Sequence, residues 1–102
     1  MKNFMMFLLL VTIVLFVSCG EEEPVADFTW TPEISTAGQE VTFTNLTEEA
    51  RSYSWDFGDS STSSLANPVH TYTNPGEFTI ELVASNRSKS DVATRTIMVI
   101  GR

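Results

Sequence analysis

The stretch Tyr53-Ser54-Trp55-Asp56-Phe57-Gly58-Asp59 decides how this chain folds. Its aromatic residues alternate with polar ones, which is the two-residue period of a β-strand with one buried face. Gly58 permits the positive φ or close backbone approach that ends a strand, and the carboxylates of Asp56 and Asp59 can accept backbone N–H groups in the following turn. The stretch therefore predicts a buried strand that ends in a tight turn.

The same alternation recurs on both sides of this stretch. Apolar residues occupy every second position in residues 26–30, 41–43, 78–84 and 97–99. Turn-forming residues such as Asn67-Pro68 and Asn74-Pro75-Gly76 separate these runs. Short strands joined by polar turns indicate an all-β sandwich.

Three segments, taken in order, resemble the PKD domain, an immunoglobulin-like module. They are residues 53–59, Asn67-Pro68-Val69-His70-Thr71-Tyr72 and Pro75-Gly76-Glu77-Phe78-Thr79-Ile80-Glu81-Leu82. The resemblance covers about residues 24–100 and implies a sandwich of about seven strands. The sequence departs from the family at Ser60 and within residues 86–90, where Gly is usual. Both departures fall in turns, so they affect turn shape and not the fold.

Within this family pattern, one set of residues is predicted to form a structural motif. Trp55 is expected at the centre of the sandwich, because a chain with a single Cys has no internal disulfide to brace its sheets. Tyr72 resembles a corner tyrosine whose hydroxyl ties a loop to the strand ends. The only His is expected to be a strand residue that hydrogen-bonds a nearby turn. The motif comprises Trp55, Asp56, Phe57, Gly58, Asp59, His70 and Tyr72.

The sequence predicts no catalytic residues, no metal site and no cofactor. It contains one His and no Gly-x-Ser-x-Gly elbow, and a domain of this size has little room for a deep cavity. Asp56 and Asp59, joined by Asp27 or Glu77 if these lie nearby, are alternative calcium ligands. No EF-hand loop is present, however, and two turn carboxylates more often cap backbone groups.

The N-terminal residues predict export and lipid attachment. The apolar run 4–17 follows Lys2 and is shorter than the roughly 20 residues of a membrane span. It ends in Phe16-Val17-Ser18-Cys19-Gly20, which resembles the lipobox of bacterial lipoproteins, although Phe16 stands where Leu is commonest. The resemblance implies that residues 1–18 are a signal peptide and that Cys19 carries acyl chains such as palmitate. Two or three such chains on one residue anchor a protein stably.

Residues 19–24 are expected to be the lipidated Cys19 and an acidic tether, and residues 25–102 the PKD domain. The tether Gly20-Glu21-Glu22-Glu23-Pro24 has two interpretations. It is either a solvated linker that keeps the domain clear of the bilayer or a sorting signal like those of surface-exposed lipoproteins in some Gram-negative bacteria. We expect lipid anchoring to the bacterial outer membrane, with surface exposure favoured.

Charge and family pattern together indicate a binding module. The 13 acidic residues against 6 basic ones argue against nucleic acid as a partner. The PKD resemblance implies a non-catalytic module that binds protein or carbohydrate, or mediates adhesion, at the cell envelope. The alternative is a structural spacer or accessory subunit of a larger envelope complex.

Two segments are candidates for contact with a ligand. A glycan-binding module needs an exposed aromatic side chain, and Trp30 is the best candidate because its strand is near an edge and closely precedes Pro32. The run Ser60–Ser64 is expected to be a flexible loop or a weak edge strand. Its alternative role is to present hydroxyl groups to a glycan or a protein edge.

Overall fold

The computed structural model describes residues 22–102, so the predicted signal peptide and Cys19 lie outside the described residues. Within this range the chain forms strands and no helix, and it therefore contains no membrane-spanning helix. The strands are β2 (Phe28–Thr31), β3 (Ile34–Thr36), β4 (Glu40–Asn45), β5 (Ser52–Asp56), β6 (Thr62–Ser63), β7 (Val69–Thr71), β8 (Gly76–Ser85) and β9 (Ser90–Ile100).

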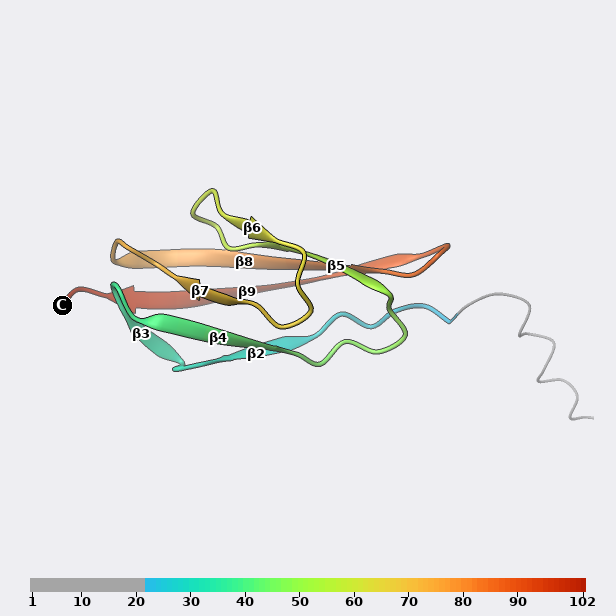
Figure 1. Cartoon of the computed structure of the whole chain (residues 1–102), viewed down its shortest axis with the longest axis horizontal. Coiled ribbons are helices and arrows are strands. Elements are labelled where there is room, and N and C mark those ends of the chain that lie inside the picture. Colours follow the sequence, from blue (N-terminus) through green and yellow to red (C-terminus); the bar gives the residue numbers. More distant parts are fainter. Residues whose placement is uncertain (1–21) are drawn as a thin grey trace, which may run out of the picture.

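The strands form two sheets that face each other (Figure 1). One has the order β2-β4-β7 and the other the order β3-β9-β8-β5-β6. All neighbouring strands are antiparallel except β3 and β9, which are parallel. The predicted all-β, immunoglobulin-like sandwich is confirmed, with eight strands in the described part of the chain.

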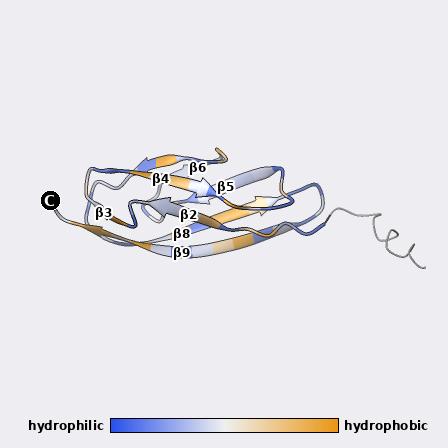
Figure 2. Ribbon diagram, turned by 90° about the horizontal axis from the view of Figure 1, so that it is seen from below, coloured by the Kyte–Doolittle hydropathy of each residue, from blue (hydrophilic) through white to orange (hydrophobic). Residues whose placement is uncertain are grey.

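Aromatic residues from both sheets fill the space between them. Trp55 is fully buried, and its ring centroid lies 5.0 Å from that of Phe28 and 5.4 Å from that of Phe43. Apolar colour is interspersed with polar colour along the strands in Figure 2, as the two-residue period requires. The buried core consists of Phe28, Ala37, Val41, Phe43, Trp55, Phe57, Tyr72, Ile80, Leu82, Ile97 and Val99.

The first two strands belong to different sheets. Strand β2 pairs with β4, and after a short bend β3 pairs with the end of β9. The chain thus crosses from one sheet to the other around Pro32, so β2 is left as the edge of the three-stranded sheet. Trp30 lies in this edge strand, just before the crossing.

The last residues of the predicted tether pack against the domain. Pro24 is buried, and the carbonyl of Glu22 accepts a hydrogen bond of 2.7 Å from Asn86 Nδ2. Val25 forms an isolated antiparallel bridge with Glu48. The fixed part of the chain therefore includes residues 22–24.

Candidate binding surface

Trp30 forms the floor of a pocket at the edge of the sandwich. Its indole is half-buried and packs against the core, with ring centroids 5.8 Å from Phe28 and 6.2 Å from Phe43. The indole Nε1–H donates a hydrogen bond of 3.1 Å to the carbonyl of Glu33. The ring is therefore held in one orientation while part of it stays open to solvent.

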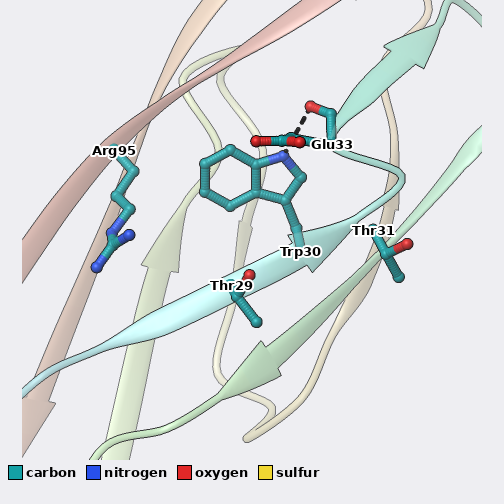
Figure 3. Close-up of a pocket in the computed structure, with 5 residues that line it drawn as sticks. All are labelled: Thr29, Trp30, Thr31, Glu33 and Arg95. Carbon is teal, nitrogen blue, oxygen red and sulfur yellow. Dashed lines mark hydrogen bonds between the residues drawn. The ribbon is translucent and has the colours of Figure 1, made fainter.

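The rim of this pocket is polar and comes from both sheets. The pocket has a volume of about 380 Å³ and is lined by Thr29, Trp30, Thr31, Glu33 and Arg95. Figure 3 shows Arg95, from β9, on one side of the indole and Glu33 on the other. An aromatic surface flanked by hydroxyl groups and by both signs of charge suits a ligand with one apolar face and several hydrogen-bonding groups.

Arg95 is held in place at the rim by two contacts. Its Nη2 lies 2.7 Å from Asp27 Oδ1, and its guanidinium lies 5.7 Å from the centroid of the Phe28 ring. Both charged side chains remain exposed, at 49% for Arg95 and 42% for Asp27. An ion pair this open to water contributes little to stability, so its main effect is to orient the guanidinium.

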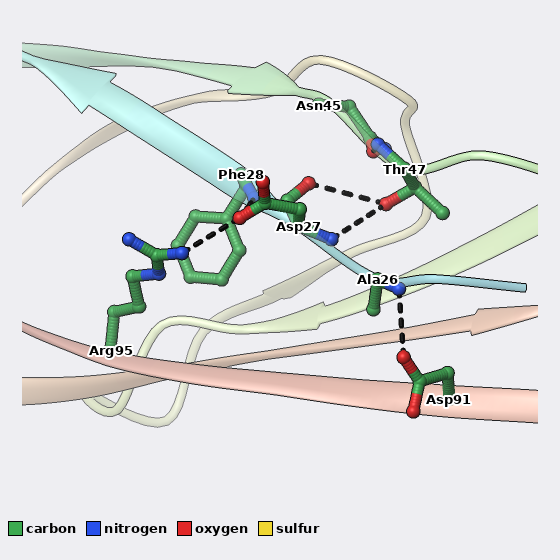
Figure 4. A network of polar contacts seen from close by, with 7 residues as sticks. All are labelled: Ala26, Asp27, Phe28, Asn45, Thr47, Asp91 and Arg95. Atoms are coloured by element: carbon green, nitrogen blue, oxygen red, sulfur yellow. Dashed lines mark hydrogen bonds and ion pairs between the residues drawn. The ribbon is translucent and has the colours of Figure 1, made fainter.

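Asp27 also anchors the start of β2 (Figure 4). Its Oδ1 accepts the Phe28 N–H at 2.9 Å, and its backbone N–H donates to Thr47 Oγ1 at 3.2 Å. The Thr47 hydroxyl donates in return to the Asp27 carbonyl, at 3.2 Å. One carboxylate therefore couples the edge strand to the arginine of the opposite sheet.

The predicted structural motif lies around the end of β5. Trp55 Nε1–H donates to the Leu65 carbonyl at 2.8 Å, and Phe57 is buried beside it. Asp56 Oδ1 accepts the Gly58 N–H at 2.9 Å, and Asp59 Oδ1 accepts the Ser61 N–H at 3.2 Å. Both carboxylates therefore act as turn caps in this structure.

The backbone conformation at position 60 shows why Gly is usual there in the family. Gly58 has φ of 85°, in the left-handed region that favours glycine. Ser60 stands where the family usually has Gly, and its φ of 78° lies in the same region. The turn therefore keeps a glycine-like backbone at a position that carries a side chain, which costs conformational energy.

His70 and Tyr72 tie β7 to this turn. His70 Nε2 lies 2.8 Å from Asp59 Oδ2, and the imidazole stacks on Phe57 at 4.3 Å. The Tyr72 hydroxyl donates a hydrogen bond of 2.8 Å to the Phe57 carbonyl. The lone histidine thus contacts a turn carboxylate and ring faces.

The ionisation of this cluster follows from its surroundings. Partial burial alone would raise the pKa of Asp59, but the hydrogen bonds from His70 and from the Ser61 backbone outweigh it, so the pKa lies below the usual value. Burial, followed by the negative charges of Asp59 and Asp56, raises the pKa of Tyr72. Asp59 is thereby kept ionised and Tyr72 neutral at physiological pH.

The sequence-predicted residues fall into separate places. The motif residues gather at the end of β5, whereas Trp30 lies in β2 with partners that come from residues 33 and 95. The run Ser60–Ser64 contains the two-residue edge strand β6. Across residues 22–102, no three His, Cys, Asp or Glu side chains converge into a group that could hold a metal ion. Cys19 lies outside the described residues.

Sequence reasoning missed Arg95. Arg95 lies in β9, and only the packing of the two sheets against each other brings it to the Trp30 pocket. The one signal in the sequence is that Arg95 takes an inward-facing position of the alternation that leads to Ile97 and Val99. A charged residue at such a position indicates that the strand has left the dry core there.

Comparison with known proteins places this fold in a family. A family model described as PKD domain matches residues 21–100. A microbial collagenase of Vibrio alginolyticus is 35% identical over 68 residues, which cover 61% of this chain and 8% of the collagenase. The chain spans between 4% and 8% of the length of the curated relatives it matches, which are collagenases and a metalloprotease.

Two solved structures share the architecture over about four fifths of the chain. The PKD1 domain of Vibrio anguillarum Epp has a TM-score of 0.70 and 31% identity, and it covers 81% of this chain and 100% of that one. A structure of carbohydrate-binding modules from the β-sandwich superfamily has a TM-score of 0.76 and 27% identity, over 80% of this chain and 36% of that one. The family model and the solved PKD1 domain agree, and the chain belongs to the PKD domain family.

Proposed function

We propose that this protein is a membrane-anchored PKD lipoprotein that acts as a non-catalytic binding or adhesion module for protein or carbohydrate at the cell envelope. PKD domains are non-catalytic modules, and the side chains around the Trp30 pocket include no nucleophile paired with a base. The pocket is the contact surface in this proposal.

The half-open indole of Trp30 is the observation that carries the binding function. It is fixed by the hydrogen bond to Glu33 and by two aromatic neighbours, so little side-chain freedom is lost when a ligand covers it. The rim supplies two hydroxyl groups and both signs of charge. A sugar ring, with an apolar face and a polar edge, matches this arrangement, and carbohydrate-binding modules are among the structural neighbours.

A protein ligand is the other form of the same proposal. Several relatives are named as collagenases, and their matching segments make up a small part of each enzyme. An aromatic side chain beside an oriented arginine is also the usual make-up of a protein-binding hot spot.

A binding assay with a soluble form of residues 20–102 tests the proposal. Insoluble cellulose, insoluble chitin and fibrous collagen serve as probes, and the protein left in the supernatant is measured. We expect retention on one probe, loss of that retention in Trp30→Ala, and little change in Tyr53→Ala. Tyr53 is the matched control, because it is also half-buried and packed against the core but lies in β5, outside the pocket.

The spacer function is the second candidate, and the positions of the chain ends favour it. The described chain begins at one end of the sandwich and its C-terminus lies at the other, as an element that separates an anchor from a partner requires (Figure 1). If no probe retains the protein and none changes the fluorescence of Trp30, the spacer function replaces the binding function.

The anchor is tested separately in cells. Cys19→Ser should move the protein out of the membrane fraction of a bacterial host, because the acyl chains need the thiol. The unchanged protein should carry the mass of the acyl chains on its first peptide and should partition with the outer membrane. An unmodified Cys19 would contradict the lipoprotein proposal without touching the Trp30 pocket.

A further inference from the structure

Residues 22–26, which we call the strap, are hydrogen-bonded to one end of the sandwich. Asn86, in the turn between β8 and β9, donates from Nδ2 to the carbonyls of Glu22, at 2.7 Å, and Glu49, at 3.1 Å. Its Oδ1 accepts the N–H groups of Ser88 and Lys89, at 3.1 and 2.9 Å, which fixes the turn itself. One amide thus joins the incoming chain, the β8–β9 turn and the loop before β5.

Two further contacts continue the strap toward β2. Val25 and Glu48 exchange backbone hydrogen bonds of 3.1 and 3.2 Å. The Ala26 N–H donates to Asp91 Oδ2 at 2.8 Å (Figure 4). Pro24 is buried between these points. The chain is therefore fixed to the domain from Glu22 onward, at several points and by partners from three segments.

All these partners lie at the same end of the molecule. The β8–β9 turn and the loop before β5 are at the end where the described chain begins, and the β7–β8 turn and the C-terminus are at the other (Figure 1). The ten residues of β8 run along the sandwich between these ends, a length of about 33 Å at 3.3 Å per residue. The molecule has one end beside the incoming chain and one end far from it.

The inference rests on the proposed lipid at Cys19. Three peptide units separate Cys19 from Glu22, and they span at most about 11 Å. Asn86 holds Glu22 beside the β8–β9 turn, so the backbone of a lipidated Cys19 starts within about 11 Å of this end of the sandwich. A free tether of the whole segment 19–24 would let the domain rotate, whereas the strap leaves little chain for rotation.

We infer that the end formed by residues 86–89 and 46–51 is the surface that faces the bilayer, and that Asn86 holds the domain in this orientation. The phospholipid headgroup layer is the partner of this end. The β7–β8 turn and the exposed apolar residues Ile34, Met98 and Ile100 then point away from the membrane. The orientation comes from the strap and not from net charge, because acidic and basic residues occur together at this end.

Fluorescence energy transfer from two positions to the membrane tests the orientation. The full lipidated protein carries a donor dye on a new cysteine, Ser88→Cys at the proposed membrane end or Thr73→Cys at the opposite end. Each form is bound to preformed phosphatidylcholine vesicles whose headgroups carry an acceptor dye. We expect the donor at position 88 to be quenched several-fold more than the donor at position 73. Equal quenching in membrane-bound protein would overturn the orientation.

The role of Asn86 is tested by removing only its side-chain N–H groups. Asn86→Asp keeps an oxygen for the N–H groups of Ser88 and Lys89 but loses the bonds to Glu22 and Glu49. Asn45→Asp is the matched control, because Asn45 Oδ1 accepts the Thr47 N–H and Nδ2 donates to Ala66, outside the strap. We expect the difference in quenching between the dyes at positions 88 and 73 to shrink in Asn86→Asp and to persist in Asn45→Asp. An unchanged difference in Asn86→Asp would remove the assigned role of Asn86.

Flotation of the vesicles separates this inference from the anchor proposal. Protein that fails to float with the vesicles and lacks acyl mass on Cys19 refutes the anchor, and the orientation with it. Protein that floats but shows equal quenching from both positions leaves the anchor standing and refutes the orientation alone.

Discussion

Two tryptophans use the same bond in different surroundings. Trp55 donates its indole N–H to Leu65 at 2.8 Å, and Trp30 donates to Glu33 at 3.1 Å, each to a loop carbonyl. Trp55 lies in β5, which has neighbours on both sides, and is fully buried. Trp30 lies in an edge strand and keeps part of its ring exposed. Residue type therefore does not separate a core residue from a candidate contact surface. Strand position alone does not either, because Phe28 in the same edge strand is fully buried.

The largest expected effect is on Trp55. Trp55→Ala should lower the free energy of unfolding by about 3–5 kcal/mol, because it removes the ring that contacts Phe28 and Phe43 and leaves a cavity. Urea denaturation of the soluble domain measures this loss. A variant as stable as the wild type would show that Trp55 is not a core residue and would contradict the comparison with Trp30.

Gly58 tests how tightly the chain packs beside Trp55. A Cβ at this position would lie 2.5 Å from the Thr79 carbonyl oxygen, and φ is 85°. Gly58→Ala should therefore destabilise the domain by about 2 kcal/mol or more. Gly101→Ala is the matched control, because a Cβ there meets nothing within 4 Å. Equal melting temperatures for the two variants would contradict the close packing.

Trp30→Ala should cost much less stability than Trp55→Ala. Only part of the Trp30 side chain is buried, so we expect a loss of about 1 kcal/mol. The same urea experiment measures this loss. The amount of protein bound to the probe that retains the wild type should fall to a much larger extent than the free energy of unfolding. Losses of similar size in the two alanine variants would make Trp30 a core residue and would weaken the binding proposal.

The smallest expected effect depends on pH. The pKa of Asp59 is lowered in the folded state, so its carboxylate adds stability above its unfolded pKa, near 3.8, and this gain is lost as the pH falls through the folded pKa. Asp59→Asn should therefore lose less stability than the wild type between pH 5 and 2, when Tm is followed across that range. His70→Phe, which removes the partner of Asp59, should reduce the same acid dependence. If it does not, another group causes the dependence.

The sequence was sufficient for the parts of the fold that alternate over several residues. The pattern around Trp55 and that of residues 78–84 place buried side chains in β5 and β8, because each strand there is long enough to show the two-residue period. Strands β3, β6 and β7 have three residues or fewer, too few for any period. Their pairing partners, and not their own residues, make them strands.

The candidate surface was only half visible in the sequence. Trp30 was recognisable as an aromatic residue near a strand edge. Arg95 and the strap from Asn86 to Glu22 were not, because they join residues more than 60 positions apart in sequence. Such contacts follow from the order of strands in the sheets, which a single sequence does not state.

The parallel pairing of β3 with β9 determines how the domain would respond to a pulling force. The described chain enters at one end of the sandwich and leaves at the other, while β3 and β9 lie side by side near the exit (Figure 1). Tension between the two ends would slide these strands past each other along their length. The hydrogen bonds of this parallel pair are evenly spaced along the strands, so they would be loaded together in shear and would not break one after another.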